Sequence, residues 1–328
     1  MTRRGDVLRL LADGELHSGE ELATRLAISR AAVWKQMRRV GDWGIELQAT
    51  PGRGYRLVEP IELLEPAAIQ CALPQIAAAR LRHLEVQEAL DSTSDRLLAV
   101  TDLPAGRFDV CLAEFQLAGR GRRGRRWLAP FASGLCLSVN WSFRDAPAAL
   151  GALSLAAGVA ILRALRKFEV AGLALKWPND VVHAGRKLGG ILIDMRGEAA
   201  GPAYVVVGVG INLRLPERIR ARLRADGIEA TDLATLAGDI PRRNALAAAL
   251  VNELALALEE FASRGLAGFS DEWRDADALA GQPVRILQGT QAVEGYARGV
   301  DTDGALLVDS GGMRRRVVSG EVSVRPLP

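Results

Sequence analysis

The sequence predicts an α+β protein built from three consecutive domains. The first sixty residues show three short amphipathic helix patterns followed by a hairpin pattern. Residues 63–277 alternate helix-like and strand-like segments, and residues 278–328 contain short alternating runs separated by turn signals. A chain of 328 residues is also longer than one hydrophobic core usually supports. We therefore place the domain boundaries at residues 1–62, 63–277 and 278–328.

The composition is that of an ordinary globular protein, with 49% hydrophobic residues, 25% charged residues and a net charge of +3. No run of about 18 apolar residues is present, and the N-terminus lacks the pattern of a secretory signal. We therefore expect a cytoplasmic protein with no membrane partner. The three cysteines, Cys71, Cys111 and Cys136, have unpaired spacings, which argue against a disulfide framework or a zinc site and predict buried thiols.

The first domain is predicted to be a winged helix-turn-helix. Ser18 and Glu21 form a capping box at the start of a second helix, and Ser29 can cap a third helix. A hairpin with the turn PGRG at residues 51–54 follows and provides the wing.

In this fold the third helix enters the major groove of DNA and the wing can reach the adjacent backbone. The DNA-binding candidates lie on the outward face of that helix and at the tip of the wing: Ser29, Arg30, Ala31, Trp34, Lys35, Arg38 and Arg53. The first sixty residues hold ten Lys or Arg against eight Asp or Glu, so one copy should bind DNA modestly and a dimer on two half-sites is expected. The alternative for this segment is a small helical bundle used for protein contacts.

The second domain is predicted to pack helices on a mixed sheet. Its helix candidates are residues 151–168 and 244–261, and its strand candidates are residues 108–115, 135–141, 173–177, 188–195 and 204–213. The third domain has five short strand patterns at close spacing, which predict a small SH3-like barrel.

The segment GRGRRGRRW at residues 119–127 places five arginines in seven positions between two strand candidates. A disordered nucleic-acid arm would normally lie at a terminus or in a long linker. A glycine-rich loop between strands can instead bring backbone N–H groups and guanidinium groups against an anion. The Walker A pattern is absent and Gly208-Val209-Gly210 lacks the third glycine of a dinucleotide fingerprint, so the anion site must be built from several segments.

Five segments, taken together and in this order, resemble the biotin–protein ligases. The winged helix-turn-helix and GEVSVR at 320–325 extend the resemblance over nearly the whole chain, to the members that also repress the biotin operon. The five segments are DSTS at 91–94, QLAGRGRRGRRW at 116–127, KWPND at 176–180, KLGGILI at 187–193 and GVGIN at 208–212.

The resemblance implies a biotin/lipoate-ligase-like catalytic domain that makes biotinyl-5′-adenylate from biotin and ATP with Mg²⁺. The biotinyl group would then pass to a lysine of the biotin carboxyl carrier protein of acetyl-CoA carboxylase. It also implies that the adenylate acts as co-repressor, promoting a homodimer that binds biotin operator DNA and represses the biotin biosynthesis genes.

The carboxylate of biotin is already ionised at neutral pH, so activation needs charge neutralisation and positioning rather than a general base. The resemblance assigns the catalytic roles to Lys187, Arg120, Arg122 and Asp180, with Asp180 also a candidate Mg²⁺ ligand. It assigns biotin binding to Ser92, Thr93, Ser94, Gln116, Arg120, Gly121, Arg122, Lys187 and Gly189. It assigns nucleotide binding to Arg122, Arg123, Trp127, Lys176, Asn179, Asn212 and Arg325.

Two residues depart from the pattern of the family. Ser94 stands where Asn is usual, and Trp34 stands on the recognition helix where a small polar residue would be easier to explain. Three alternatives remain: a biotin ligase without DNA binding, a lipoate– or octanoate–protein ligase, and a transcription factor whose central domain only senses a ligand.

Overall fold

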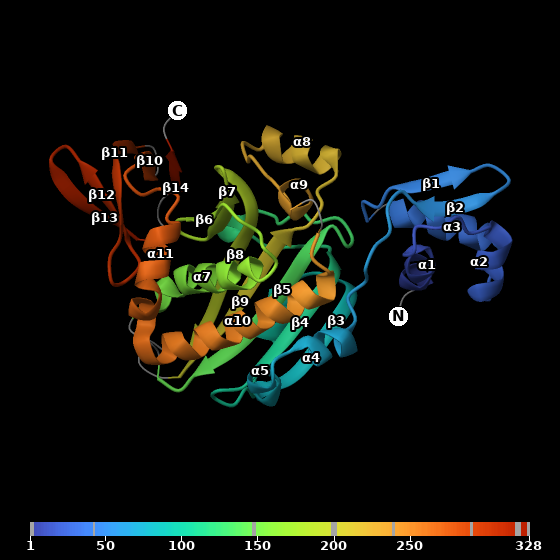
Figure 1. Cartoon of the computed structure of the whole chain (residues 1–328), viewed down its shortest axis with the longest axis horizontal. Coiled ribbons are helices and arrows are strands. Elements are labelled where there is room, and N and C mark those ends of the chain that lie inside the picture. Colours follow the sequence, from blue (N-terminus) through green and yellow to red (C-terminus); the bar gives the residue numbers. More distant parts are fainter. Residues whose placement is uncertain are drawn as a thin grey trace.

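The computed structural model describes residues 3–41, 43–145, 149–197, 202–237, 240–288, 291–318 and 323–326. Three bodies follow one another along the chain, with the winged helix-turn-helix and the C-terminal strands at opposite ends of the central sheet (Figure 1). No helix among the described residues is long and apolar enough to cross a membrane. The exact domain boundaries remain predictions.

The N-terminal body has the predicted winged helix-turn-helix arrangement. Both predicted caps are present, since the Glu21 amide donates to Ser18 Oγ at 3.0 Å and the Ala32 amide donates to Ser29 Oγ at 3.2 Å. Leu22 is fully buried in the small core that these helices share. The elements are α1 (Arg3–Leu11), α2 (Gly19–Arg25), α3 (Arg30–Gly41) and a hairpin of β1 (Leu47–Thr50) and β2 (Gly54–Leu57).

His17 fastens the wing to the helices. Its backbone exchanges two hydrogen bonds with Tyr55 of β2, each 2.9 Å long. Its ring is 7% exposed and lies between two carboxylates, with Nε2 2.9 Å from Asp13 Oδ2 and Nδ1 3.1 Å from Glu21 Oε1. Burial acts to lower the pKa of His17, but the hydrogen bonds and charges of these two carboxylates outweigh it and the pKa is raised.

Raising the pH from about 6 to about 9 is expected to weaken the attachment of the wing. A histidine whose folded-state pKa lies above its unfolded value contributes stability that is fully present below about pH 6.5 and is lost as the pH rises through the folded pKa. Hydrogen exchange at the Tyr55 amide, which donates to the His17 carbonyl, measures this opening. A His17→Gln variant should lose the pH dependence, and equal protection of wild-type Tyr55 at both pH values would contradict it.

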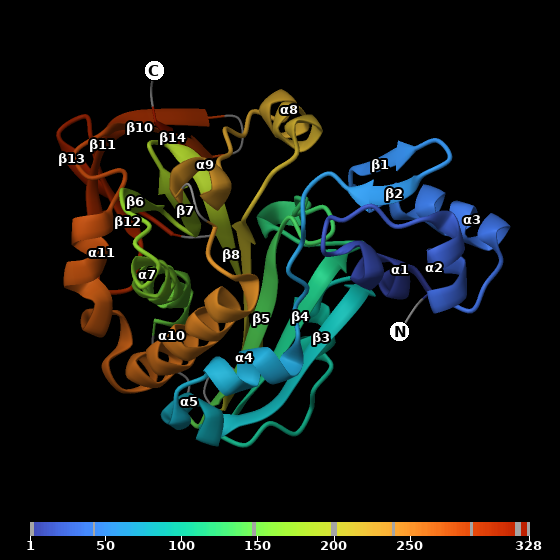
Figure 2. The ribbon, with the colours of Figure 1, turned by 45° about the vertical axis from the view of Figure 1, so that its right-hand side comes forward.

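The central body is a seven-stranded sheet of order β3-β4-β5-β9-β8-β7-β6, in which only the β3–β4 pair is parallel (Figure 2). The predicted strands are all present, and β3 and β7 are two additional strands that the sequence analysis missed. The strands are β3 (Leu81–Leu90), β4 (Phe108–Gln116), β5 (Gly134–Phe143), β6 (Leu173–Lys176), β7 (Asp180–His183), β8 (Arg186–Gly197) and β9 (Ala203–Asn212).

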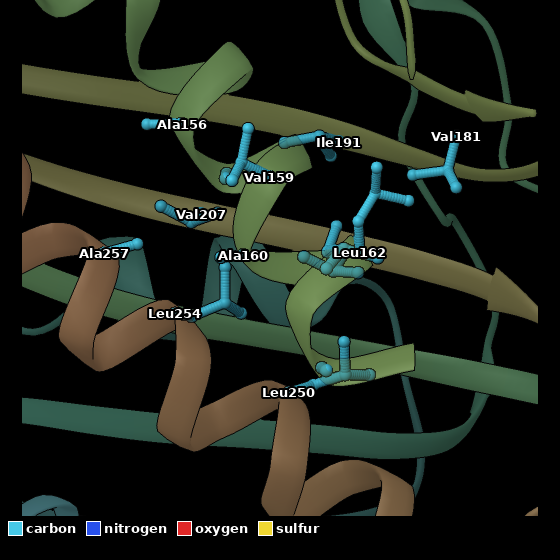
Figure 3. Close-up of a cluster of buried hydrophobic side chains, with 14 of the residues drawn as sticks. Ala156, Val159, Ala160, Leu162, Val181, Ile191, Val207, Leu250, Leu254 and Ala257 are labelled. Atoms are coloured by element: carbon cyan, nitrogen blue, oxygen red, sulfur yellow. The ribbon is translucent and has the colours of Figure 1, made fainter. Parts of the chain in front are cut away.

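Helices α7 and α10 cover one face of this sheet. Figure 3 shows Val159 of α7 close to Ile191 of β8 in the core between the helices and the sheet. Helix α6 packs on the opposite face, where Leu97 meets Cys111 and Val206. The helices are α4 (Pro66–Ala72), α5 (Gln75–Arg80), α6 (Thr93–Leu98), α7 (Leu153–Arg166), α8 (Glu217–Ala225), α9 (Leu233–Ala237), α10 (Arg243–Arg264) and α11 (Ser270–Ala276), with 3₁₀ turns at η1 (Arg122–Gly124), η2 (Leu150–Ala152) and η3 (Gly265–Phe269).

The prediction of buried thiols is correct for Cys111 and Cys136 and wrong for Cys71. Cys71 lies on α4, which buries Ile69 against the core and leaves Cys71 exposed.

The C-terminal body is a five-stranded antiparallel sheet of order β13-β12-β11-β10-β14. It packs on the central core through Val284 and Ile286, and the indole Nε1 of Trp177 donates to the Gly304 carbonyl at 2.9 Å. Closure of these strands into an SH3-like barrel remains a prediction. The strands are β10 (Pro283–Gln288), β11 (Gln291–Val300), β12 (Leu306–Ser310), β13 (Met313–Val317) and β14 (Ser323–Pro326).

The segment that leads from the winged helix-turn-helix to α4 is fixed to the central body. The Leu64 amide donates to Glu114 Oε1 at 2.6 Å, and Glu114 forms a buried ion pair with Arg243, also at 2.6 Å. Asn244 donates from Nδ2 to Glu62 Oε1 at 2.8 Å. The linker between the two domains is therefore held against the central body by hydrogen bonds.

A stack of three aromatic rings forms a second attachment of the winged helix-turn-helix. The ring of Trp43, just after α3, lies 5.2 Å from the ring of Phe131 and 5.8 Å from the ring of Phe115. The Phe131 amide donates to the Trp43 carbonyl at 2.9 Å. Phe115 precedes Gln116 at the end of β4, so this stack attaches the winged helix-turn-helix to the strand that carries Gln116.

Replacing Trp43 by alanine is expected to destabilise the chain by about 3–5 kcal/mol, because it removes a buried aromatic ring and leaves a cavity. Chemical denaturation of the full chain measures this loss. The exposed Trp34 provides the matched control, since Trp34→Ala should change the free energy of unfolding by no more than about 0.5 kcal/mol. Equal losses for the two variants would contradict the structural role of the stack.

Candidate active site

One cavity of about 460 Å³ gathers nearly all of the predicted ligand-contacting residues. It opens at the ends of β4, β7, β8 and β9 and is covered by the arginine-rich loop. The predicted residues that line it are Ser92, Thr93, Ser94, Gln116, Arg120, Gly121, Arg122, Arg123, Trp127, Lys176, Asn179, Asp180, Lys187 and Asn212.

The arginine-rich loop, residues 119–127, forms a compact hairpin. Arg120 and Arg126 pair across it, and its tip is a turn in which Arg123 has φ 58° and Gly124 has φ 71°. Two successive positive φ values are typical of a type I′ turn, whose second position favours glycine. The Trp127 amide closes the loop by donating to the Gly119 carbonyl at 2.9 Å.

Lys187 is the cationic centre of the cavity. Its Nζ donates to Asp180 Oδ1 at 2.5 Å and lies 5.8 Å from the centroid of the Trp127 ring. A bulge in the β7–β8 pair leaves Leu188 without a partner residue, so that Lys187 pairs with Val182.

Arg122 adds a second cation beside Lys187. Its Nη1 donates to Asn179 Oδ1 at 3.3 Å. Burial and the positive charge of Arg123 lower the pKa of Arg122, while the carboxylate of Asp180 opposes this shift. An anion placed in the cavity would relieve the electrostatic cost of burying this guanidinium.

The Trp127 ring packs against the backbone of two glycines, Gly190 and Gly210. Gly190 of β8 lies directly opposite Gly210 of β9, and a Cβ atom on Gly210 would meet Cζ2 of the Trp127 indole at 2.6 Å. A Cβ on Gly190 would lie 3.4 Å from Cζ3 of the indole and 3.3 Å from Lys187 Nζ. The indole therefore packs so close to the backbone of Gly210 that a side chain there would displace the ring.

Hydroxyl and amide groups converge on the other side of the cavity. Ser92 caps α6, and Gln116 Oε1 accepts from the Thr93 amide at 2.9 Å. The buried hydroxyl of Ser138 lies 2.8 Å from Thr93 Oγ1 and 3.1 Å from Ser94 Oγ. Such a mixture of donors and acceptors suits a polar ring such as a ureido group. The shorter Ser94 side chain is part of this network.

Asn179 and Asn212, the predicted nucleotide-binding asparagines, both donate to backbone carbonyls that border the cavity. Asn179 Nδ2 donates to the Ile191 carbonyl at 2.8 Å, and Asn212 Nδ2 donates to the Thr231 carbonyl at 3.0 Å. The segment 227–230 also lines the cavity, and the Lys187 amide donates to the Glu229 carbonyl at 2.7 Å. This segment was missed because it carries no sequence motif.

Two predicted residues are not placed in the cavity. Gly189 faces away from it, toward the Ile211 side chain and the Gly210 carbonyl, and its neighbour Gly190 lines the cavity instead. The side chain of Arg325 lies outside the described residues, although its backbone belongs to β14.

All seven DNA-binding candidates are exposed on one body. Trp34 is 53% exposed on α3, and the guanidinium of Arg38, one turn later, lies 5.1 Å from the centroid of its ring. Arg53 is exposed at the tip of the wing. The arrangement leaves the outward face of α3 exposed.

Comparisons with known proteins agree with this geometry. Residues 87–212 match the Biotin/lipoate A/B protein ligase family, residues 3–56 match an HTH domain and residues 280–325 match the Biotin protein ligase C terminal domain. The Bifunctional ligase/repressor BirA of Salmonella typhimurium is 39% identical over 320 residues, which cover 97% of this chain and 96% of the relative; the protein of that name from Escherichia coli gives the same figures.

A solved structure shares the fold. The biotin protein ligase from Aquifex aeolicus in complex with biotin and ATP matches with a TM-score of 0.61 and 26% sequence identity, over 75% of this chain and 100% of that chain. Identity at this level over almost the whole chain, together with the matched domains, places the sequence in one family. The chain belongs to the biotin–protein ligase family, in the group of bifunctional ligase/repressors that carry an N-terminal helix-turn-helix domain.

Proposed function

We propose that this chain activates biotin with ATP and transfers the biotinyl group to a lysine of the biotin carboxyl carrier protein of acetyl-CoA carboxylase. The observation that carries this proposal is the cavity that brings Lys187 and Arg122 together with a cluster of hydroxyl and amide groups. The cations suit a carboxylate and a phosphate, and the polar cluster suits the ureido ring of biotin.

In the first step an oxygen of the biotin carboxylate attacks the α-phosphorus of ATP, and the bond to pyrophosphate breaks. The carboxylate and the phosphate are both anionic, so the main barrier is their repulsion. Lys187 and Arg122 lie where they can offset it, and Arg123 and Lys176 line the same cavity. The indole of Trp127 excludes water from the reacting atoms.

In the second step the amine of the acceptor lysine attacks the acyl carbon of the adenylate, an amide bond forms and AMP leaves. The lysine ammonium must lose one proton before its nitrogen can attack, and the nitrogen loses a second proton as the amide forms. Asp180 is the carboxylate nearest the cationic centre, 2.5 Å from Lys187 Nζ, and is positioned to orient the amine or accept its proton.

Mg²⁺ would enter with the nucleotide. Among the described residues no group of three or more His, Cys, Asp or Glu could hold a metal ion. Mg²⁺ commonly uses one or two carboxylates together with substrate phosphates and water. Asp180 fits that pattern as a single protein ligand, and a bound Mg²⁺ would supply further neutralisation of the phosphates.

ATP–pyrophosphate exchange tests the activation step, run with biotin, with lipoate and with no acid. Exchange that requires biotin supports the proposal. Exchange with lipoate alone would instead support the lipoate ligase, and a well-folded chain that exchanges with neither acid would support a sensing role.

We also propose that the adenylate-bound chain dimerises and binds biotin operator DNA. The exposed recognition helix and its HTH match support the DNA partner. Strand β7 pairs with β8 only as far as Gly190, and Asn179 still bonds to the backbone of Ile191, so among the described strands residues 192–197 of β8 pair on one side only. An open strand edge that carries the exposed Met195 can pair with a second copy.

Operator binding with and without biotinyl-5′-adenylate, together with sedimentation, tests the repressor role. Adenylate should raise both the dimer fraction and the affinity for operator DNA. Efficient biotin transfer without operator binding in either condition would identify a ligase that has no repressor function.

A further inference from the structure

The guanidinium of Arg120, at the base of the arginine-rich loop, faces two carboxylates of the protein. Nη1 and Nη2 donate to the two carboxylate oxygens of Asp194 at 3.1 Å and 2.6 Å. Nη2 also lies 2.8 Å from Asp95 Oδ1. The guanidinium fork is therefore engaged by two carboxylates of the protein, and its charge is already compensated.

The two carboxylates come from the elements that carry the rest of the site. Asp95 lies in the first turn of α6, directly after the predicted biotin readers Thr93 and Ser94. Asp194 lies on β8, which also provides Lys187. Arg120 thus joins the base of the arginine-rich loop to both walls of the cavity.

Arg122 donates to Asn179, and burial and Arg123 disfavour its charge while the carboxylate of Asp180 favours it. Both terminal nitrogens of Arg120 donate to carboxylate oxygens, whereas Lys187 Nζ donates to one carboxylate, that of Asp180. Neutralisation of a bound anion is therefore assigned to Lys187 and Arg122 rather than to Arg120. This division differs from the sequence analysis, which assigned Arg120 a catalytic role.

We propose that Asp95 and Asp194 are positioning residues that hold the arginine-rich loop over the cavity through Arg120. Arg120 acts in this way by placing Arg122 and Trp127, and not by contacting the phosphate. The effect of this anchor, the contacts of Arg120 with Asp95 and Asp194, on biotin activation rests on the proposed function. The anchor itself does not.

Limited proteolysis with trypsin tests the anchor directly, because the loop contains five arginines within residues 120–126. In the ligand-free chain, cleavage after Arg122, Arg123, Arg125 or Arg126, mapped by mass spectrometry, reports the population of the open loop. Asp194→Asn should raise the cleavage rate on the order of tenfold, since it removes a bidentate charge-assisted contact. Asp95→Asn should have a smaller effect, because Asp95 is 51% exposed.

Matched variants separate the anchor from a general loss of stability. Asp271→Asn removes a carboxylate from another exposed ion pair, with Arg274, and should leave cleavage of the loop unchanged. Arg120→Gln should cleave at least as fast as Asp194→Asn, because it also removes the contact with Asp95, and the Arg120→Gln/Asp194→Asn double variant should cleave no faster than Arg120→Gln. Asp194→Glu should restore part of the protection.

Three results would overturn the proposal: Asp194→Asn cleaved no faster than Asp271→Asn, Arg120→Gln cleaved at the wild-type rate, or additive effects in the double variant. If Asp194→Asn fails to fold, Asp95→Asn provides the same comparison.

Kinetics then distinguish positioning from direct contact. Asp194→Asn should raise KM for biotin on the order of tenfold with kcat changed less than about threefold, since the loop still closes at saturating ligand. Arg122→Gln should instead lower kcat. A fall in kcat for Asp194→Asn as large as that for Arg122→Gln would contradict the positioning role.

Discussion

Replacing Lys187 by glutamine is expected to lower kcat for adenylate formation on the order of 10²–10³-fold, the usual effect of removing one preorganised group that stabilises developing charge. The ammonium lies at the point where Asp180 and the Trp127 ring meet, with Asp180 Oδ1 2.5 Å from Nζ. Glutamine keeps a hydrogen-bond donor toward Asp180 but removes the positive charge. The carboxylate of biotin and the α-phosphate would then approach each other with less compensation.

Pyrophosphate exchange at saturating biotin and ATP measures this effect. Arg186→Gln is the matched control, because it removes one positive charge from the adjacent residue, which does not line the cavity. We expect its kcat to stay within about threefold of the wild type. A Lys187→Gln variant with comparable activity would show that the charge of Lys187 is dispensable for activation.

The winged helix-turn-helix could be predicted almost completely from the sequence, because its signals are local. The caps at Ser18 and Ser29 each involve a backbone amide three positions away, and helical periodicity correctly placed Trp34 on the outward face of the third helix. The principal central strands and the helices α7 and α10 were likewise predicted from apolar patterns that tertiary packing reinforces.

The active-site segments were predicted through a family resemblance, but the detailed geometry of their side chains could not be predicted. Strict strand alternation places Lys187 and Gly189 on one face, but the bulge at Leu188 shifts the register. Gly190 therefore faces the cavity beside Lys187. A bulge is determined by the pairing of two strands, which no local pattern in one strand reveals.

Contacts between distant segments were also beyond sequence reasoning. Asp95 and Asp194 are ordinary polar residues until the fold brings α6 and β8 to the same guanidinium. The stack of Trp43 on Phe131 likewise joins two domains through residues 88 positions apart. Such contacts depend on the complete topology, and composition or spacing carries no signal for them.

Replacing Gly210 by alanine is expected to lower activation about 10²-fold, because a small displacement of a reacting group can have an effect of this size. The new methyl group would lie 2.6 Å from Cζ2 and 2.8 Å from Nε1 of Trp127, distances that real Cβ atoms essentially never show. Backbone on β9 cannot yield easily, since Gly210 is paired on both sides, with Cys136 and Gly190. The indole ring of Trp127 must therefore move away from Gly210.

The effect of Gly210→Ala should act through Trp127, and a double-mutant cycle tests this route. In a Trp127→Ala background the methyl group meets no ring, so adding Gly210→Ala should cost less than about threefold in pyrophosphate exchange. Gly151→Ala is the control for a glycine-to-alanine change, because a Cβ there meets nothing within 4 Å, and it should leave exchange unaffected. If Gly210→Ala costs as much without the indole as with it, the methyl group disturbs the sheet itself. Loss of activity would then report damage to β9 rather than displacement of the ring that covers the reacting atoms.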